Sequence, residues 1–198
     1  MRAIAIREDI EDVILDAADR LLARYGYRKM TMEDLAQEVG IGKGTIYLHF
    51  RSKEELVLSH IDRLVDRLKE QLRSIAQSDK QSAERLRLML LARVMFRFDG
   101  VQHYTESLSD LLAAIRPALL ARRNRHFEDE ARIFAEVLTD GQKAGVFTFT
   151  DALSTAHTLL LATNALLPYS LSAAQLGKRR DVEKAASRIA DLILHGLL

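Results

Sequence analysis

Apolar residues recur at intervals of three and four along almost the whole chain, a spacing that places them on one face of an α-helix. The first such stripe consists of Ile10, Val13, Ile14, Ala17, Ala18, Leu21, Leu22 and Tyr25. It predicts a helix that ends near Gly26. The only strand-like stretch, residues 147–149, is too short to be more than a connection. We therefore expect an all-α protein.

Two much shorter helical patterns follow in the stretch TMEDLAQEVGIGKGTIYLHFRSKEEL, which begins at Thr31. Thr31 has the chemistry of a helix N-cap and Asp34 gives an imperfect capping box, so residues 32–39 are predicted to form two helical turns. Gly40 breaks this helix, and residues 43–50 are predicted to form the next one. Together with the first helix they make a three-helix unit.

Two short helices joined by a glycine-containing turn have the shape of a helix-turn-helix, whose second helix enters the DNA major groove. Ile46 and Phe50 lie four residues apart and are predicted to face the core. The residues expected to meet DNA, mainly its phosphates, are Thr31, Lys43, Gly44, Thr45, Tyr47, His49 and Lys53. Residue types alone leave a second interpretation open, because the polar face of a short helix is often only solvated.

This part of the chain resembles the TetR family of bacterial transcription regulators, the tetracycline-repressor-like sensors. The resemblance rests on Thr31, Leu35, Ala36, Val39-Gly40, Gly42-Lys43-Gly44-Thr45-Ile46-Tyr47, His49-Phe50 and Ser52-Lys53-Glu54-Glu55-Leu56. It implies that Thr31, Lys43, Thr45, Tyr47, His49 and Lys53 touch operator DNA. It also implies a helix-turn-helix DNA-binding domain over residues 1–52 and a larger helical domain over residues 53–198 that binds a small molecule and dimerises.

The remaining sequence is compatible with that architecture. Ser52 and Glu55 form a capping box that opens a long helix, which would join the two domains. Later helical patterns cover residues 82–98, 104–115, 117–141, 150–169 and 181–198, with Pro117 at the start of the third of these. About nine helices are expected in all.

The last two helical patterns are apolar around nearly their whole circumference. A helix of this kind must be buried on more than one side, and we expect a second copy of the chain to provide the second cover. A central core helix within a monomer is the alternative for one of the two. A twofold homodimer through these helices would place two recognition helices about one DNA turn apart, or a multiple of it, to read a pseudo-palindrome.

An effector pocket in the helical domain would be mostly apolar with a few polar groups. The residues that suit such a pocket are Met95, Phe96, His103, Tyr104, Phe134, Asn164 and Tyr169. Each of them also suits an ordinary core position.

A basic run over residues 122–126 is followed by acidic residues at pairing distance, which predicts a solvated, salt-bridged helix face. His126 and Glu130 have the spacing of metal ligands but lack a third one, so no metal site and no cofactor are expected.

Composition limits the kinds of chemistry and the cellular locations that the chain can have. The chain has 198 residues, 48% of them hydrophobic, no cysteine and a net charge of +1. Disulfides and thiolate chemistry are therefore excluded, and DNA binding would depend on the local placement of Lys43, Arg51 and Lys53 rather than on net charge. The start of the chain has no apolar run of signal-peptide length, and no segment approaches the roughly 20 apolar residues that cross a bilayer. A cytoplasmic location is therefore expected.

The predicted function is a ligand-responsive transcriptional regulator that binds operator DNA as a homodimer and is released by a small molecule; repression is the mode that the resemblance implies. A non-specific or architectural DNA-binding protein without an effector is the alternative. The six histidines form no H-E-x-x-H or comparable motif, so an enzyme is not expected. A protein-only interaction module would leave Lys43 and Tyr47 irrelevant to DNA.

Overall fold

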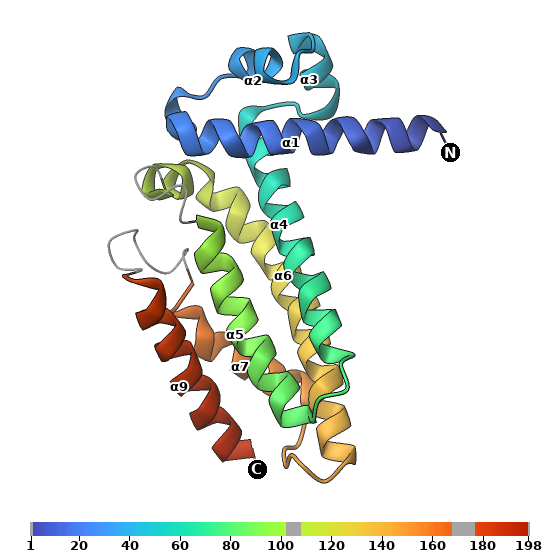
Figure 1. Ribbon diagram of the computed structural model, residues 1–198, viewed down its shortest axis with the longest axis vertical. Coiled ribbons are helices and arrows are strands. Elements are labelled where there is room, and N and C mark those ends of the chain that lie inside the picture. The colour runs from blue at the N-terminus through green and yellow to red at the C-terminus, as the bar shows by residue number, and fades with distance from the viewer. Residues whose placement is uncertain (1, 102–107, 168–176, 198) are drawn as a thin grey trace. The chain divides into compact units, whose positions relative to one another are not determined.

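The computed structural model describes residues 2–101, 108–167 and 177–197, without the side chains of residues 2–9, 108 and 109. These ranges contain eight α-helices and no strand, which confirms the predicted all-α fold (Figure 1). The helices are α1 (Arg2–Lys29), α2 (Met32–Val39), α3 (Lys43–His49), α4 (Lys53–Ala76), α5 (Ser82–Val101), α6 (Leu108–Lys143), α7 (Ala152–Asn164) and α9 (Arg179–Leu197). Within the described ranges, no helix combines the length and the apolar character needed to cross a lipid bilayer.

The chain forms two compact units. The first unit comprises the described residues within 1–64 and 103–119, and the second unit those within 65–102 and 120–198. Helices α4 and α6 therefore each contribute residues to both units. The division between residues 52 and 53 into a DNA-binding and an effector domain is a division by function, and it stays a prediction.

The first unit contains α1, α2 and α3, the start of α4 and the first part of α6. The buried stripe of α1 consists of Ile14, Leu15, Ala17, Ala18, Leu21 and Leu22. Gly26 has a φ of 74° and kinks α1 where the sequence predicted its end, and a last helical turn continues to Lys29. Only glycine adopts this backbone conformation at little cost.

The local signals that start and stop α2 act as the sequence predicted. The backbone N–H of Asp34 donates to Thr31 Oγ1 at 3.1 Å, and the N–H of Thr31 donates to Asp34 Oδ2 at 2.9 Å, which completes the capping box. Gly40 ends the helix in the left-handed conformation, and its N–H donates to the carbonyl of Ala36 at 2.9 Å. Both ends of this two-turn helix are therefore fixed by hydrogen bonds within the chain.

The start of α4 departs slightly from the predicted capping box. The N–H of Glu55 donates to Ser52 Oγ at 3.0 Å, as expected. The Glu55 carboxylate, however, accepts a hydrogen bond from the N–H of Arg51 at 2.8 Å rather than from that of Ser52. The reciprocal half of the box is thus displaced by one residue.

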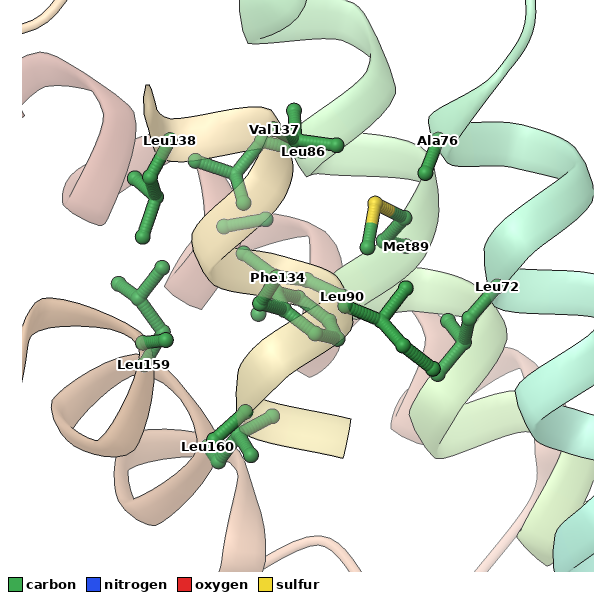
Figure 2. Packing of buried hydrophobic residues seen from close by; sticks show 14 of the residues in the cluster. Leu72, Ala76, Leu86, Met89, Leu90, Phe134, Val137, Leu138, Leu159 and Leu160 are labelled. Atoms are coloured by element: carbon green, nitrogen blue, oxygen red, sulfur yellow. The ribbon is translucent and has the colours of Figure 1, made fainter. Parts of the chain in front are cut away.

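The core of the second unit is a cluster of aliphatic side chains around Phe134 of α6. Leu72 of α4, Leu90 of α5 and Leu160 of α7 are fully buried in the same cluster (Figure 2). Ala190 of α9 is also fully buried there. Each helix thus contributes one apolar face, so the period of the sequence pattern accounts for the packing.

One helix prediction was wrong. The sequence favoured a break between residues 115 and 117, but α6 runs without interruption from Leu108 to Lys143 with Pro117 inside it. Proline removes one helical hydrogen bond and frees the carbonyl four residues earlier, at Ala113. Both residues are exposed, so water can solvate the freed carbonyl and the helix continues.

A single helical glycine permits the close packing near the end of α6. A Cβ atom added to the buried Gly141 would lie 2.2 Å from Cδ2 of Phe147 and 3.0 Å from Cβ of Ser82. Gly141→Ala is therefore expected to lower the free energy of unfolding by about 2 kcal/mol, measured by urea denaturation. Gly44→Ala is the control, since its Cβ would meet no atom within 4 Å, and it should not destabilise the fold. Equal stability of both variants would contradict this packing.

Candidate nucleic-acid interface

Helix α3 turns one face to the core of the first unit and the opposite face outward. Ile46 is fully buried and Phe50, the C-cap residue, is nearly so, as the sequence predicted. Because each residue turns the helix by about 100°, Gly44 and Leu48 lie on the side opposite Ile46. Leu48 is 77% exposed. The outward face of α3 thus belongs to a single helix, and the major groove is wide enough to accept one helix.

Lys43 and Tyr47 form one flank of this outward face. Lys43 Nζ donates to the Glu33 carboxylate of α2 and lies 5.8 Å from the centroid of the Tyr47 ring. The hydrogen bond from Lys43 lowers the pKa of Glu33, and the same contact raises the pKa of Lys43. Both side chains of the ion pair are about half exposed, so a phosphate oxygen could take the place of the Glu33 carboxylate.

Thr31 and Thr45 lie in different surroundings. The Thr31 hydroxyl donates to Asp34 Oδ2 at 2.7 Å while it accepts from the Asp34 N–H, so it is engaged in the cap of α2. Thr45 lies half-buried on the other flank of α3 from Lys43. The structure thus places Lys43, Gly44, Thr45 and Tyr47 together on one short helix.

His49 and Lys53 point into the first unit. His49 Nδ1 lies 3.0 Å from Glu11 Oε1 of α1, and only 9% of the His49 side chain is exposed. Lys53 Nζ donates to the carbonyls of Tyr27 at 2.8 Å and Met30 at 3.0 Å. These side chains tie α3 and α4 to α1 and to Met30 just after it. Sequence spacing alone gave no sign of such long-range partners.

Replacement of Lys53 is therefore expected to affect the stability of the fold more than it affects DNA binding directly. Its ammonium also lies 4.5 Å from the centroid of the Tyr27 ring, a cation–π contact. Lys53→Met should lower the free energy of unfolding by about 1 to 2 kcal/mol, measured by thermal and urea denaturation. Lys29→Met, at an exposed position on the same unit, is the control. Undiminished stability of Lys53→Met with weakened DNA binding would instead assign the ammonium to a phosphate.

Acidic residues of α1 fasten the first turns of α4 to the first unit. Arg63 donates through Nη1 to Asp12 Oδ1 at 2.9 Å and through Nη2 to Asp16 Oδ1 at 2.7 Å. The buried His60 lies one turn earlier, with Nε2 3.2 Å from Asp19 Oδ1. Three aspartates of α1 therefore hold α4.

The proposed pocket residues fall into different environments. Phe134 is fully buried at the centre of the second unit's core, Met95 is buried and Phe96 is half-buried. Asn164 Oδ1 accepts a hydrogen bond from Arg93 Nη2 at 2.9 Å. His103, Tyr104 and Tyr169 lie outside the described residues.

A buried charged network in the second unit was missed by the sequence analysis. Arg93 of α5 is 1% exposed, and its Nε donates to Glu130 Oε2 of α6 at 2.8 Å. Its Nη1 donates to the carbonyl of Leu160 at 3.1 Å and to Thr163 Oγ1 at 2.6 Å, both on α7. One guanidinium thus joins three helices. The available signal was the presence of two charged residues, Arg93 and Arg97, in the otherwise apolar run of residues 88–98.

The same network corrects the prediction of a solvated, salt-bridged face after residue 122. Glu130 and His126 are both buried. Burial would raise the pKa of Glu130, but the positive charges of Arg97 and Arg93 outweigh it and hold that pKa below its usual value. Asp129 conforms to the prediction, since it pairs at 3.1 Å with the exposed Arg132. The face is therefore divided between a solvated edge and a buried one.

Comparison with known proteins shows which proteins share this arrangement of helices. Residues 14–59 match the family described as "Bacterial regulatory proteins, tetR family". These residues extend from the buried stripe of α1 through α2 and α3 into the start of α4. The chain is also 28% identical over 141 residues to the HTH-type transcriptional repressor KstR2 of Mycobacterium tuberculosis (strain ATCC 25618 / H37Rv), a match that covers 68% of this chain and 67% of that protein.

Solved structures share the fold along nearly the whole chain. A transcriptional regulator from Cytophaga hutchinsonii superposes with a TM-score of 0.78 at 21% identity and covers 94% of this chain and 97% of that one. FadR from Bacillus subtilis, solved in complex with stearoyl-CoA, gives a TM-score of 0.65 at 18% identity and covers 94% and 98%. At these identities the structures establish the fold alone. Together with the match over α1 to α4, they confirm the resemblance seen in the sequence, and the chain is a member of the TetR family of transcription regulators.

Proposed function

We propose that this chain is a ligand-responsive transcriptional repressor that acts in the cytoplasm, binds a pseudo-palindromic operator as a homodimer and leaves it when a small molecule binds. The observation that carries the proposal is the outward face of α3, where Lys43, Thr45 and Tyr47 surround Gly44. Residues 1–52 would bind DNA, and residues 53–198 would bind the effector and dimerise.

The side chains on α3 have distinct roles in this proposal. Lys43 exchanges Glu33 for a phosphate, and the Tyr47 and Thr45 hydroxyls donate to neighbouring phosphates or base edges. Gly44 exposes backbone that can approach DNA closely. His49 and Lys53 act indirectly, because their contacts with α1 fix the orientation of α3 and α4.

Exposed leucines support a homodimer through α7 and α9. Leu161 of α7 is 60% exposed and Leu192 of α9 is 74% exposed in the single chain. Both helices pack against α5 with their other faces, where Leu160 and Leu194 are buried. The same two helices of a second copy would cover the exposed leucines around a twofold axis, since such an interface is self-complementary.

The effector is proposed to bind in the second unit. KstR2 is named a repressor, which supports repression by this chain. The FadR structure holds stearoyl-CoA, which supports a small-molecule effector with apolar parts. Helix α4 contributes residues to both units, so an effector that favours one position of α4 would alter the spacing of the two α3 helices. This requires different affinities of the effector for the two states.

A selection from random duplex DNA tests the proposal. Purified protein is mixed with the pool at moderate salt, and retained sequences are read. Enrichment of a pseudo-palindrome supports a dimeric operator-binding protein, and release by candidate acyl thioesters then tests the effector. Retention without sequence preference would favour the non-specific DNA-binding alternative, whose affinity depends on salt but hardly on sequence. No retention would refute DNA binding altogether.

A further inference from the structure

Leu48 is the most exposed side chain of α3. It lies opposite the fully buried Ile46 and is 77% exposed. Gly44 lies one turn before it on the same side and has no side chain. Single exposed leucines are common on protein surfaces. The position of this one, at the centre of the outward face of α3, is what gives it a role.

The neighbours of Leu48 suit the backbone of DNA, whereas Leu48 itself does not. Lys43 and Tyr47 lie on one flank and bring an ammonium and a hydroxyl, and Thr45 lies on the other flank and brings a second hydroxyl. These groups can donate hydrogen bonds to phosphates on the two walls of a groove. An isobutyl group can neither donate nor accept a hydrogen bond, so Leu48 can contact only an apolar group on the groove floor.

The major-groove edge of DNA offers one such group. Of the four bases, only thymine carries a methyl group there, at C5, and apolar side chains recognise it by contact. We propose that Leu48 determines part of the operator sequence by packing on the C5-methyl group of one thymine in each half-site. This inference rests on the proposed binding of α3 in the major groove, and it adds a specificity-determining residue to it.

The test removes the methyl group without altering base pairing. In the selected operator, each thymine is replaced in turn by deoxyuridine, symmetrically in both half-sites, and affinity is measured for wild type and Leu48→Ala. One thymine should be sensitive in wild type: loss of one buried methyl group weakens binding about fourfold per half-site and about 15-fold for both. Leu48→Ala should bind the unmodified operator more weakly and show no further loss at that thymine.

The outcomes separate this inference from the proposed function. Failure of the selection to enrich any sequence overturns both. Specific binding with no thymine in the half-sites, or with equal sensitivity to deoxyuridine in wild type and Leu48→Ala, overturns the role of Leu48 alone. Leu120→Ala, at an exposed leucine of α6, is the matched control and should retain the wild-type response at every position. Because Leu48 is exposed, its replacement should leave the unfolding temperature unchanged.

Discussion

Replacing Glu130 with glutamine is expected to lower the free energy of unfolding by about 4 kcal/mol. The carboxylate is buried and accepts hydrogen bonds from Arg93 Nε at 2.8 Å and from Arg97 Nη2. The variant keeps the shape of the side chain but removes its negative charge. Arg93, which is 1% exposed, then remains buried as a cation without its counterion, and this accounts for most of the loss.

The loss should depend on pH in a defined direction. The positive charges of Arg97 and Arg93 overcome the effect of burial and hold the pKa of Glu130 below its ordinary value of 4.5. The folded state therefore binds this proton less readily than the unfolded state does. The carboxylate stabilises the fold above the unfolded pKa, and the stabilisation is lost as pH falls through the lower, folded pKa. The difference in stability between wild type and Glu130→Gln should thus shrink below about pH 4.5.

Urea denaturation at a series of pH values measures both effects. Glu136→Gln is the matched control, because Glu136 lies on the same helix and is exposed. It should differ from wild type by no more than about 0.5 kcal/mol at any pH. A Glu130→Gln variant as stable as this control at neutral pH would show that the charge of Glu130 does not hold Arg93 in the fold.

Features that depend on neighbouring residues were predictable from the sequence. The capping box of Thr31 and Asp34 spans four residues, and the core positions of Ile46 and Phe50 follow from the helical period. The break at Gly40 is equally local. In each case the physical cause lies within about one helical turn, so the sequence contains all the information that is needed.

Features that depend on distant partners were not predictable. Arg93 meets Glu130 across 37 residues and Thr163 across 70, and Lys53 meets the carbonyl of Tyr27 across 26. A sequence pattern shows only that a charged residue interrupts an apolar run; it does not show which other element supplies the partner. For Lys53 the consequence is functional, since a residue expected at DNA has its ammonium turned toward the end of α1.

Replacing Lys43 with alanine is expected to weaken operator binding on the order of 100-fold, about tenfold for each subunit of the dimer. Lys43 is the exposed cation on the flank of α3, and its partner in the free chain is Glu33. If it neutralises one phosphate per subunit, its loss also removes the release of about two counterions. The slope of log K against log salt should then become shallower by about two.

Glu33→Gln, at the same ion pair, is expected to change operator affinity in the opposite direction. The Glu33 carboxylate competes with phosphate for Lys43 and repels the DNA backbone, so its neutralisation should tighten binding several-fold. The two variants together distinguish a cation that neutralises phosphate from one that serves only to pair with α2. Lys80→Ala, which breaks an exposed pair with Glu84 in the second unit, controls for the general loss of positive charge. A salt slope in Lys43→Ala equal to that of Lys80→Ala would remove Lys43 from the DNA contact, because phosphate neutralisation cannot be lost without a change in counterion release.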